Sequence, residues 1–234
     1  MIPKAFHFIW ISNDLQEDND VKDNHLKVIR SFGRYNSDYE LVLWKNKGVR
    51  AILEKYKKIM PKAVELIYDD KTLLAQKTDI IRMIILKEHG GIYVDLDTIC
   101  VGNFDDLLEH SFFIGEEKAK CKEHMHDEFP IASDMHYIQN CCVGSEKNHI
   151  LIAIYFRRLL SAKNKYRISY GPNLCEDALY HYKELYGDLS KDGIKILNND
   201  YFFSCNYFET PHVNNLKKFT KIIHFYSGTS KNGK

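Results

Sequence analysis

One continuous segment, residues 72–98 (TLLAQKTDIIRMIILKEHGGIYVDLDT), limits the possible folds of this chain more than any other. Its first part places apolar side chains at helical spacing, which predicts a helix with a wide buried face. Gly90 and Gly91 end this helix, because glycine adopts a left-handed C-cap conformation without steric cost. Residues 92–94 (IYV) then predict a short buried strand.

Two aspartates, Asp95 and Asp97, come directly after this strand. Alternate side chains of an extended backbone share a face, so both carboxylates can point to one site. Carboxylates held this close repel each other unless a cation or a proton lies between them. A hard divalent ion with oxygen ligands is the natural occupant, and a nucleotide phosphate can complete its coordination.

A polar pair, Asp79 and Arg82, interrupts the otherwise apolar helix before the glycines. The two residues are three positions apart and therefore lie on one helical face. Such a pair faces either solvent or a site. If the helix packs behind the strand, the pair leans toward the aspartates; the alternative is an ion pair that only braces the helix.

These residues resemble the sugar-binding region of glycosyltransferases that carry a DXD motif, family 32 in the sequence classification. The family pattern is roughly A-x-x-S-D-x-x-R-x-x-x-L-x-x-x-G-G-x-Y-x-D-x-D. The chain departs from it at Thr78, where serine is usual, and matches it at Ala75, Asp79, Arg82, Leu86, Gly90, Gly91, Tyr93, Asp95 and Asp97. The resemblance implies an α/β, GT-A-like domain in which Asp79, Arg82 and Tyr93 bind the nucleotide sugar.

The amino terminus, IPKAFHFIW, is similar to the opening I-P-K-x-x-H-x-x-W of the same family. Taken alone, Phe6 to Ile11 predicts an apolar strand with Trp10 near its carboxyl end. Ligands bind at that end of the strands in open α/β sheets. The resemblance implies that Trp10 stacks near the nucleotide base; a core tryptophan is the alternative.

Two further matches to the family are shorter. Asn140 precedes a predicted helix, as an asparagine often does there, and the resemblance implies that it contacts the donor sugar. A buried structural asparagine is the alternative. Tyr170-Gly171-Pro172 resembles the family's T-G-P turn, which we expect to border the acceptor pocket, although Gly-Pro signals a turn in any protein.

The carboxyl end, KIIHFYSGTSKNGK, resembles the family's closing H-x-x-x-S-W segment but lacks its tryptophan. The resemblance implies that His224 joins the metal site, and histidine is a good ligand for manganese-like ions. It also implies that Ser227 and Ser230 bind the donor's phosphates, with Lys231 beside them. A frayed basic tail is the alternative.

The remaining chain predicts alternating helices and strands around a mostly parallel, Rossmann-like sheet. We expect strands at 39–44, 107–115, 194–197 and 222–226, and helices at 21–34, 49–58, 150–160 and 175–186. The second of these helices should stop near Pro61. Without repeats or linkers, 1–234 is predicted to be one domain, with a nucleotide-sugar half (1–100) and an acceptor half (101–234).

Composition fits a single enzyme domain. The chain has 234 residues, 44% of them hydrophobic, and its net charge of +1 gives no reason to expect nucleic acid. No apolar run approaches the ~20 residues of a membrane span. We therefore expect a cytoplasmic bacterial protein with six free thiols, with peripheral association at the inner membrane face left open.

The predicted activity is transfer of a hexose with retention of configuration. Mn²⁺ or Mg²⁺ on Asp95, Asp97 and His224 would neutralise the donor's diphosphate. A UDP-hexose is favoured over GDP-mannose as the donor. We expect the acceptor to be a glycan or lipid-linked glycan of a surface polysaccharide, and a host protein, as in glucosylating toxins, is the alternative.

Other chemistries fit parts of the sequence. VDLDT matches the D-x-D-x-T motif of haloacid-dehalogenase-like phosphatases, in which Asp95 would be the nucleophile and Asp97 the general acid. That motif usually lies on the first strand, whereas more than 90 residues precede it here. A catalytically dead sugar-binding domain is a third interpretation. Cys121, His124 and His126 invite a zinc site, but their spacing favours a charged loop near the acceptor side.

Overall fold

The computed structural model describes residues 1–116, 138–161, 170–204 and 216–225. Its centre is a six-stranded sheet in the order β2-β1-β3-β6-β5-β7. Three of the five pairings are parallel (β1 with β2 and β3, and β5 with β7), and β6 runs antiparallel to both neighbours. The predicted α/β class with a mostly parallel sheet is confirmed. The strands are β1 Ala5–Ile9, β2 Glu40–Trp44, β3 Gly91–Val94, β5 Phe112–Glu116, β6 Ile138–Ser145 and β7 Ile194–Leu197.

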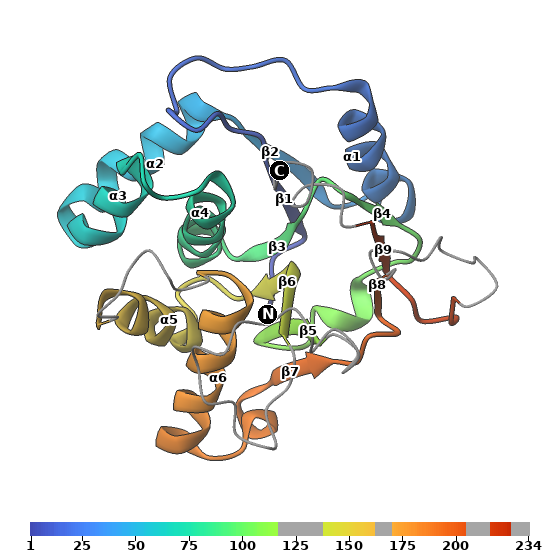
Figure 1. Cartoon of the computed structure of the whole chain (residues 1–234). Helices are drawn as coiled ribbons and strands as arrows, with labels where there is room; N and C mark the ends of the chain where they lie inside the picture. Colours follow the sequence, from blue (N-terminus) through green and yellow to red (C-terminus); the bar gives the residue numbers. More distant parts are fainter. Residues whose placement is uncertain (117–137, 162–169, 205–215, 226–234) are drawn as a thin grey trace, which may run out of the picture.

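Helices cover both faces of this sheet, and each face has its own core (Figure 1). On one face pack α2 to α6, through aliphatic residues such as Leu53, Ile67 and Ile84. On the other lie α1 and a small second sheet, around an aromatic cluster that includes Phe6, Phe32 and Phe104. The helices are α1 Asp23–Tyr35, α2 Asn46–Ile59, α3 Pro61–Tyr68, α4 Leu74–His89, α5 Ile150–Ser161 and α6 Pro172–Tyr186.

The second sheet has the order β4-β9-β8, with β4 Thr98–Cys100, β9 Ile222–His224 and β8 Phe202–Ser204. Strand β9 is antiparallel to β4 and parallel to β8. The register pairs Thr98 with His224. This pairing places His224, far away in the sequence, opposite the residue that follows Asp97.

Several predicted boundaries were wrong. Strand β1 ends at Ile9 rather than Ile11, and the strand expected from residue 107 begins only at Phe112, after a short 3₁₀ turn at Asp105–Leu107. The helix expected at 49–58 does stop before Pro61, at Ile59, but Pro61 then begins a further helix, α3, that was not predicted. Proline is tolerated there because N–H groups in the first turn of a helix have no intrahelical acceptor, so the missing N–H costs no hydrogen bond.

Strand β6 was not recognised as a strand in the sequence, although it lies in the middle of the sheet. All eight of its residues are buried. Since both faces are covered, IQNCCVGS has none of the apolar–polar alternation that marks a half-exposed strand. Its central position makes the sheet mixed rather than wholly parallel.

The glycine pair between α4 and β3 is required by backbone geometry. Gly90 and Gly91 have φ of +68° and +90°. A Cβ on Gly91 would lie 2.8 Å from the Ala5 carbonyl oxygen and 2.8 Å from His7 Nε2. Glycine therefore lets the start of β3 approach β1 closely.

Burial holds two histidines in the neutral form. His7 Nδ1 accepts a hydrogen bond from Trp44 Nε1 (3.2 Å), and its Nε2 lies 2.9 Å from the Gly90 carbonyl oxygen. His149 Nδ1 accepts a hydrogen bond from the Leu151 backbone N–H (3.1 Å). Burial lowers the pKa of each ring from 6.5 to about 4.

We expect these histidines to make the fold acid-sensitive. The unfolded chain takes up their protons near pH 6.5 and the folded chain only near pH 4, so the stabilisation is complete above pH 6.5 and is lost as the pH falls toward 4. Each histidine should contribute about 2–3 kcal/mol to this loss. Urea unfolding at about pH 7 and about pH 4.5 measures it, with His7→Gln as the variant of smaller pH dependence. A free energy of unfolding independent of pH would contradict the prediction.

Candidate active site

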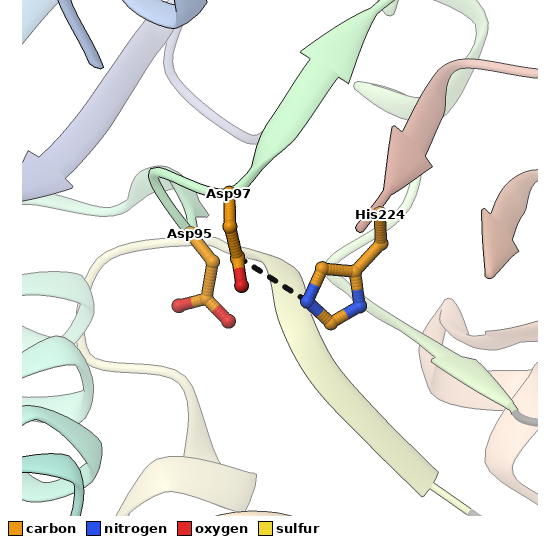
Figure 2. Close-up of side chains that lie close together, drawn as sticks. All are labelled: Asp95, Asp97 and His224. Carbon is orange, nitrogen blue, oxygen red and sulfur yellow. Dashed lines mark ion pairs between the residues drawn. The ribbon is translucent and has the colours of Figure 1, made fainter. Parts of the chain in front are cut away.

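The two aspartates after β3 and the histidine of β9 face one another at the carboxyl end of the sheet. Figure 2 shows Asp95 and Asp97 side by side, with the His224 ring reaching toward them from β9. His224 Nε2 lies 3.3 Å from Asp97 Oδ1. One ligand atom from each residue falls within 4.8 Å of the other two. The structure thus brings together all three residues predicted to bind the metal.

Backbone hydrogen bonds to β6 and to the residue after β9 hold the loop that carries the two aspartates. The Asp95 N–H donates to the Cys141 carbonyl of β6 (2.8 Å), and the Asp97 carbonyl accepts from the Phe225 N–H (2.9 Å). Burial raises the pKa of Asp95, and nearby Arg82 opposes this shift. Burial lowers the pKa of His224, but Cys141 and Asp97 outweigh it and leave this pKa well above its usual value.

This donor set fits a divalent cation. Two carboxylates supply the hard oxygen ligands that Mn²⁺ and Mg²⁺ prefer, and an imidazole favours the manganese-like ion of the two. Because the three groups converge on one small volume, a cation there would also relieve the repulsion between the carboxylates.

Arg82 connects α4 to this site. The helix ends at His89, and Gly90 and Gly91 turn the chain into β3, so that Arg82 in the middle of the helix lies near Asp95 after the strand. Arg82 Nη2 lies 2.9 Å from Asp79 Oδ1, and Nη1 lies 3.5 Å from Asp95 Oδ1. The guanidinium also stacks 4.3 Å from the centre of the Tyr93 ring, whose hydroxyl donates to Asp95 Oδ1 (2.5 Å). Asp79 and Arg82 are buried, so this is not an exposed brace.

Asp79 sits where three separate elements meet. Its Oδ1 accepts a hydrogen bond from Asn140 Nδ2 of β6 (2.8 Å), and the Asn140 carbonyl accepts from Arg82 Nη1 (2.5 Å). A Cβ on Gly171 would lie 2.7 Å from both Asp79 carboxylate oxygens and 2.5 Å from Asn140 Nδ2. Burial raises the pKa of Asp79 to about 6, against the opposing effects of Arg82 and Asn140. The Gly-Pro turn therefore packs directly on this carboxylate, which the sequence did not reveal.

Trp10 follows the end of β1, as predicted, and its backbone N–H donates to the Trp44 backbone carbonyl (2.9 Å). Its ring lies 4.8 Å from the ring of His25 on α1, and His25 Nδ1 lies 3.1 Å from the Leu96 carbonyl oxygen. Trp10 Nε1 is buried and makes no hydrogen bond within the described residues. The tryptophan thus reaches the loop between the two aspartates through His25, a residue that carried no signal in the sequence.

Some predicted features fall outside the described residues. These are Ser227, Ser230 and Lys231 of the closing segment and the Cys121, His124 and His126 cluster. Four cysteines that are described, Cys100, Cys141, Cys142 and Cys175, are buried free thiols, as expected.

Residues 22–114 match the family model described as "Glycosyltransferase sugar-binding region containing DXD motif". This range includes α4, β3 and both aspartates. This segment of the chain is a DXD sugar-binding region of that family. The chain is a glycosyltransferase, and VDLDT is its DXD motif rather than a phosphatase motif.

Two relatives extend the match. The "Uncharacterized glycosyltransferase L373" of Acanthamoeba polyphaga mimivirus is 28% identical over 209 residues, or 88% of this chain and 74% of the viral protein. "Inositol phosphoceramide mannosyltransferase 3" of Schizosaccharomyces pombe is 30% identical over 114 residues. That alignment covers 48% of this chain and only 29% of the yeast protein.

Solved structures share the fold. The UDP-bound glycosyltransferase domain from the YGT toxin superposes with a TM-score of 0.53 at 8% identity, over 83% of this chain and 79% of the toxin domain. The fold is therefore GT-A-like, as the resemblance implied. In the described part of the chain, every helix is too short or too polar to cross a membrane.

Proposed function

We propose that this glycosyltransferase transfers a hexose from a nucleotide sugar to a glycan or lipid-linked glycan, with a divalent cation and with retention of configuration. One observation carries the proposal: Asp95, Asp97 and His224 converge beside the buried Arg82–Asp79 pair at the carboxyl end of β3. A cation site for the diphosphate thus adjoins a polar group suited to a sugar.

The chemistry depends on charge. Mn²⁺ or Mg²⁺ held by Asp95, Asp97 and His224 would act as a Lewis acid toward the departing diphosphate. The largely buried Arg82 keeps a positive charge beside Asp95. We assign Asp79, whose Oδ1 contacts Asn140 and Arg82, to hydrogen bonding with a hydroxyl of the donor sugar. Such contacts orient the donor for attack.

Donor and acceptor are inferred from the relatives. The similar toxin domain binds UDP, which favours a UDP-hexose, and the yeast relatives are named mannosyltransferases, which keeps GDP-mannose as the alternative. Because the yeast enzyme is named for a phosphoceramide, a lipid-linked acceptor is favoured over a protein. We place Trp10 against the nucleotide base and Asn140 against the sugar. We assign Ser227 and Ser230 to the phosphates of the donor. We also propose that the reaction belongs to the biosynthesis of a surface glycan.

A panel of nucleotide sugars, each with and without Mn²⁺, tests the proposal. The preferred donor should raise the melting temperature only with the metal, since a ligand at 100 times its Kd stabilises the folded state by about 2.7 kcal/mol. It should also release nucleoside diphosphate slowly to water and faster to an acceptor. Hydrolysis of simple phosphate monoesters that disappears in Asp95→Asn would overturn the proposal.

A further inference from the structure

Positive charge is concentrated in one short segment of this nearly neutral chain. Residues 45–62 contain seven basic residues and a single acidic one, Glu54, for a net charge of +6. The whole chain carries +1, so the rest carries −5. The basic residues are Lys45, Lys47, Arg50, Lys55, Lys57, Lys58 and Lys62.

The segment lies on the outside of the molecule. It forms α2 and the start of α3, which make up one edge of the structure (Figure 1). The inner faces of these helices bury apolar side chains such as Leu53 and Ile67. The lysines project the other way, and Lys47, Lys55, Lys57, Lys58 and Lys62 are exposed.

Large apolar side chains are exposed on the same helices and at the start of α4. Leu73 is 68% exposed and Ile59 54%, and Tyr68 and Leu74 are also exposed. Lys57 Nζ lies 5.8 Å from the centre of the Tyr68 ring, so the basic and apolar groups adjoin. Two of these lysines are ion-paired, Lys57 with Glu54 and Lys55 with Glu88 (2.5 Å each), and the exposed Glu65 and Asp70 are near them in the sequence. We call Lys55, Lys57, Lys58, Lys62, Ile59, Tyr68, Leu73 and Leu74 the basic–apolar face.

The basic–apolar face borders the active site. Leu74 begins α4, and Asp79 and Arg82 follow on the same helix. At 1.5 Å per residue, they are about 8 and 12 Å further along its axis. A surface that docks through Leu73 and Leu74 would therefore lie within about 12 Å, along the helix axis, of the residues assigned to the sugar.

We infer that the basic–apolar face docks on an anionic lipid bilayer. Clustered lysines are attracted to anionic headgroups, and neighbouring apolar side chains insert at the boundary of the acyl chains. A nucleic acid would account for the lysines but not for the four exposed apolar residues. The inference rests on the proposed function only in that docking would present a lipid-linked acceptor to the site.

Co-sedimentation with lipid vesicles tests this inference. The protein should bind phosphatidylcholine vesicles that contain phosphatidylglycerol, and not vesicles of phosphatidylcholine alone. Lys58→Glu/Lys62→Glu should weaken binding at least about thirtyfold, since each lysine lost is worth about fivefold. The matched control is Lys191→Glu/Lys195→Glu, the same charge change at exposed lysines beside and within β7. It should bind like the wild type.

Leu73→Ser tests the apolar part separately. Leu73 is the N-cap residue of α4, where serine is preferred, so weaker vesicle binding cannot be attributed to a weaker helix. Release of nucleoside diphosphate in vesicle-free solution should be unchanged in all three variants, which separates a failure of docking from a failure of the proposed function. Equal loss of binding in both lysine double variants, or equally tight binding to a DNA duplex at the same salt concentration, would overturn the inference.

Discussion

Replacing Asp97 with alanine should reduce sugar transfer at least about a thousandfold while leaving the protein folded. Asp97 is one of the three residues that converge on the proposed cation site, and its Oδ1 faces His224 Nε2. Without it, the charge of the diphosphate would lose its counter-ion. Its removal relieves the repulsion with Asp95 but also breaks the contact with the buried His224, so the melting temperature of the protein alone should stay close to that of the wild type.

Turnover assays and calorimetry with Mn²⁺ and nucleoside diphosphate check this result. The variant should lose the metal-dependent part of nucleotide binding. Asp70→Ala, which removes an exposed carboxylate outside the site, should keep wild-type turnover and metal dependence. Wild-type activity in Asp97→Ala would refute the assignment of the metal site.

Removing Arg82 should cost both stability and activity. Its guanidinium contacts Asp79, Asn140 and Tyr93 in a buried cluster. Arg82→Ala would leave the Asp79 carboxylate buried without its partner, which destabilises a protein by about 3–5 kcal/mol. An exposed helical pair would be worth only about 0.3–0.5 kcal/mol.

Arg82→Lys separates the two roles of this residue. Lysine keeps the positive charge beside Asp79 but lacks the planar fork that reaches Asp79, Asn140 and Asp95 together. We expect Arg82→Lys to fold and to bind free nucleoside diphosphate almost normally, yet to transfer sugar far more slowly. Urea unfolding, calorimetry and turnover measure the three quantities. Near-normal turnover would show that Arg82 only braces the helix.

The sequence was most informative where local rules act alone. Residues 74–94 form the predicted helix, glycine stop and strand because apolar spacing and positive φ at Gly90 and Gly91 are properties of neighbouring residues. The family pattern then indicated a glycosyltransferase, which the match over residues 22–114 confirmed. Strand β7 was predicted to the residue, because its turn signals lie immediately beside it.

The tertiary structure decided which distant residues join this local core. Strand β6 brings Asn140 to Asp79, and the register of β9 on β4 places His224 opposite Thr98. The Gly171 turn reaches Asp79 across 92 residues of sequence. These contacts follow from the pairing of strands and the burial of both sheet faces. The energy of strand pairing depends on all the strands that take part, and it cannot be calculated from one segment alone. The sequence therefore indicated these residues only through the family resemblance, and the tertiary structure decided where they lie.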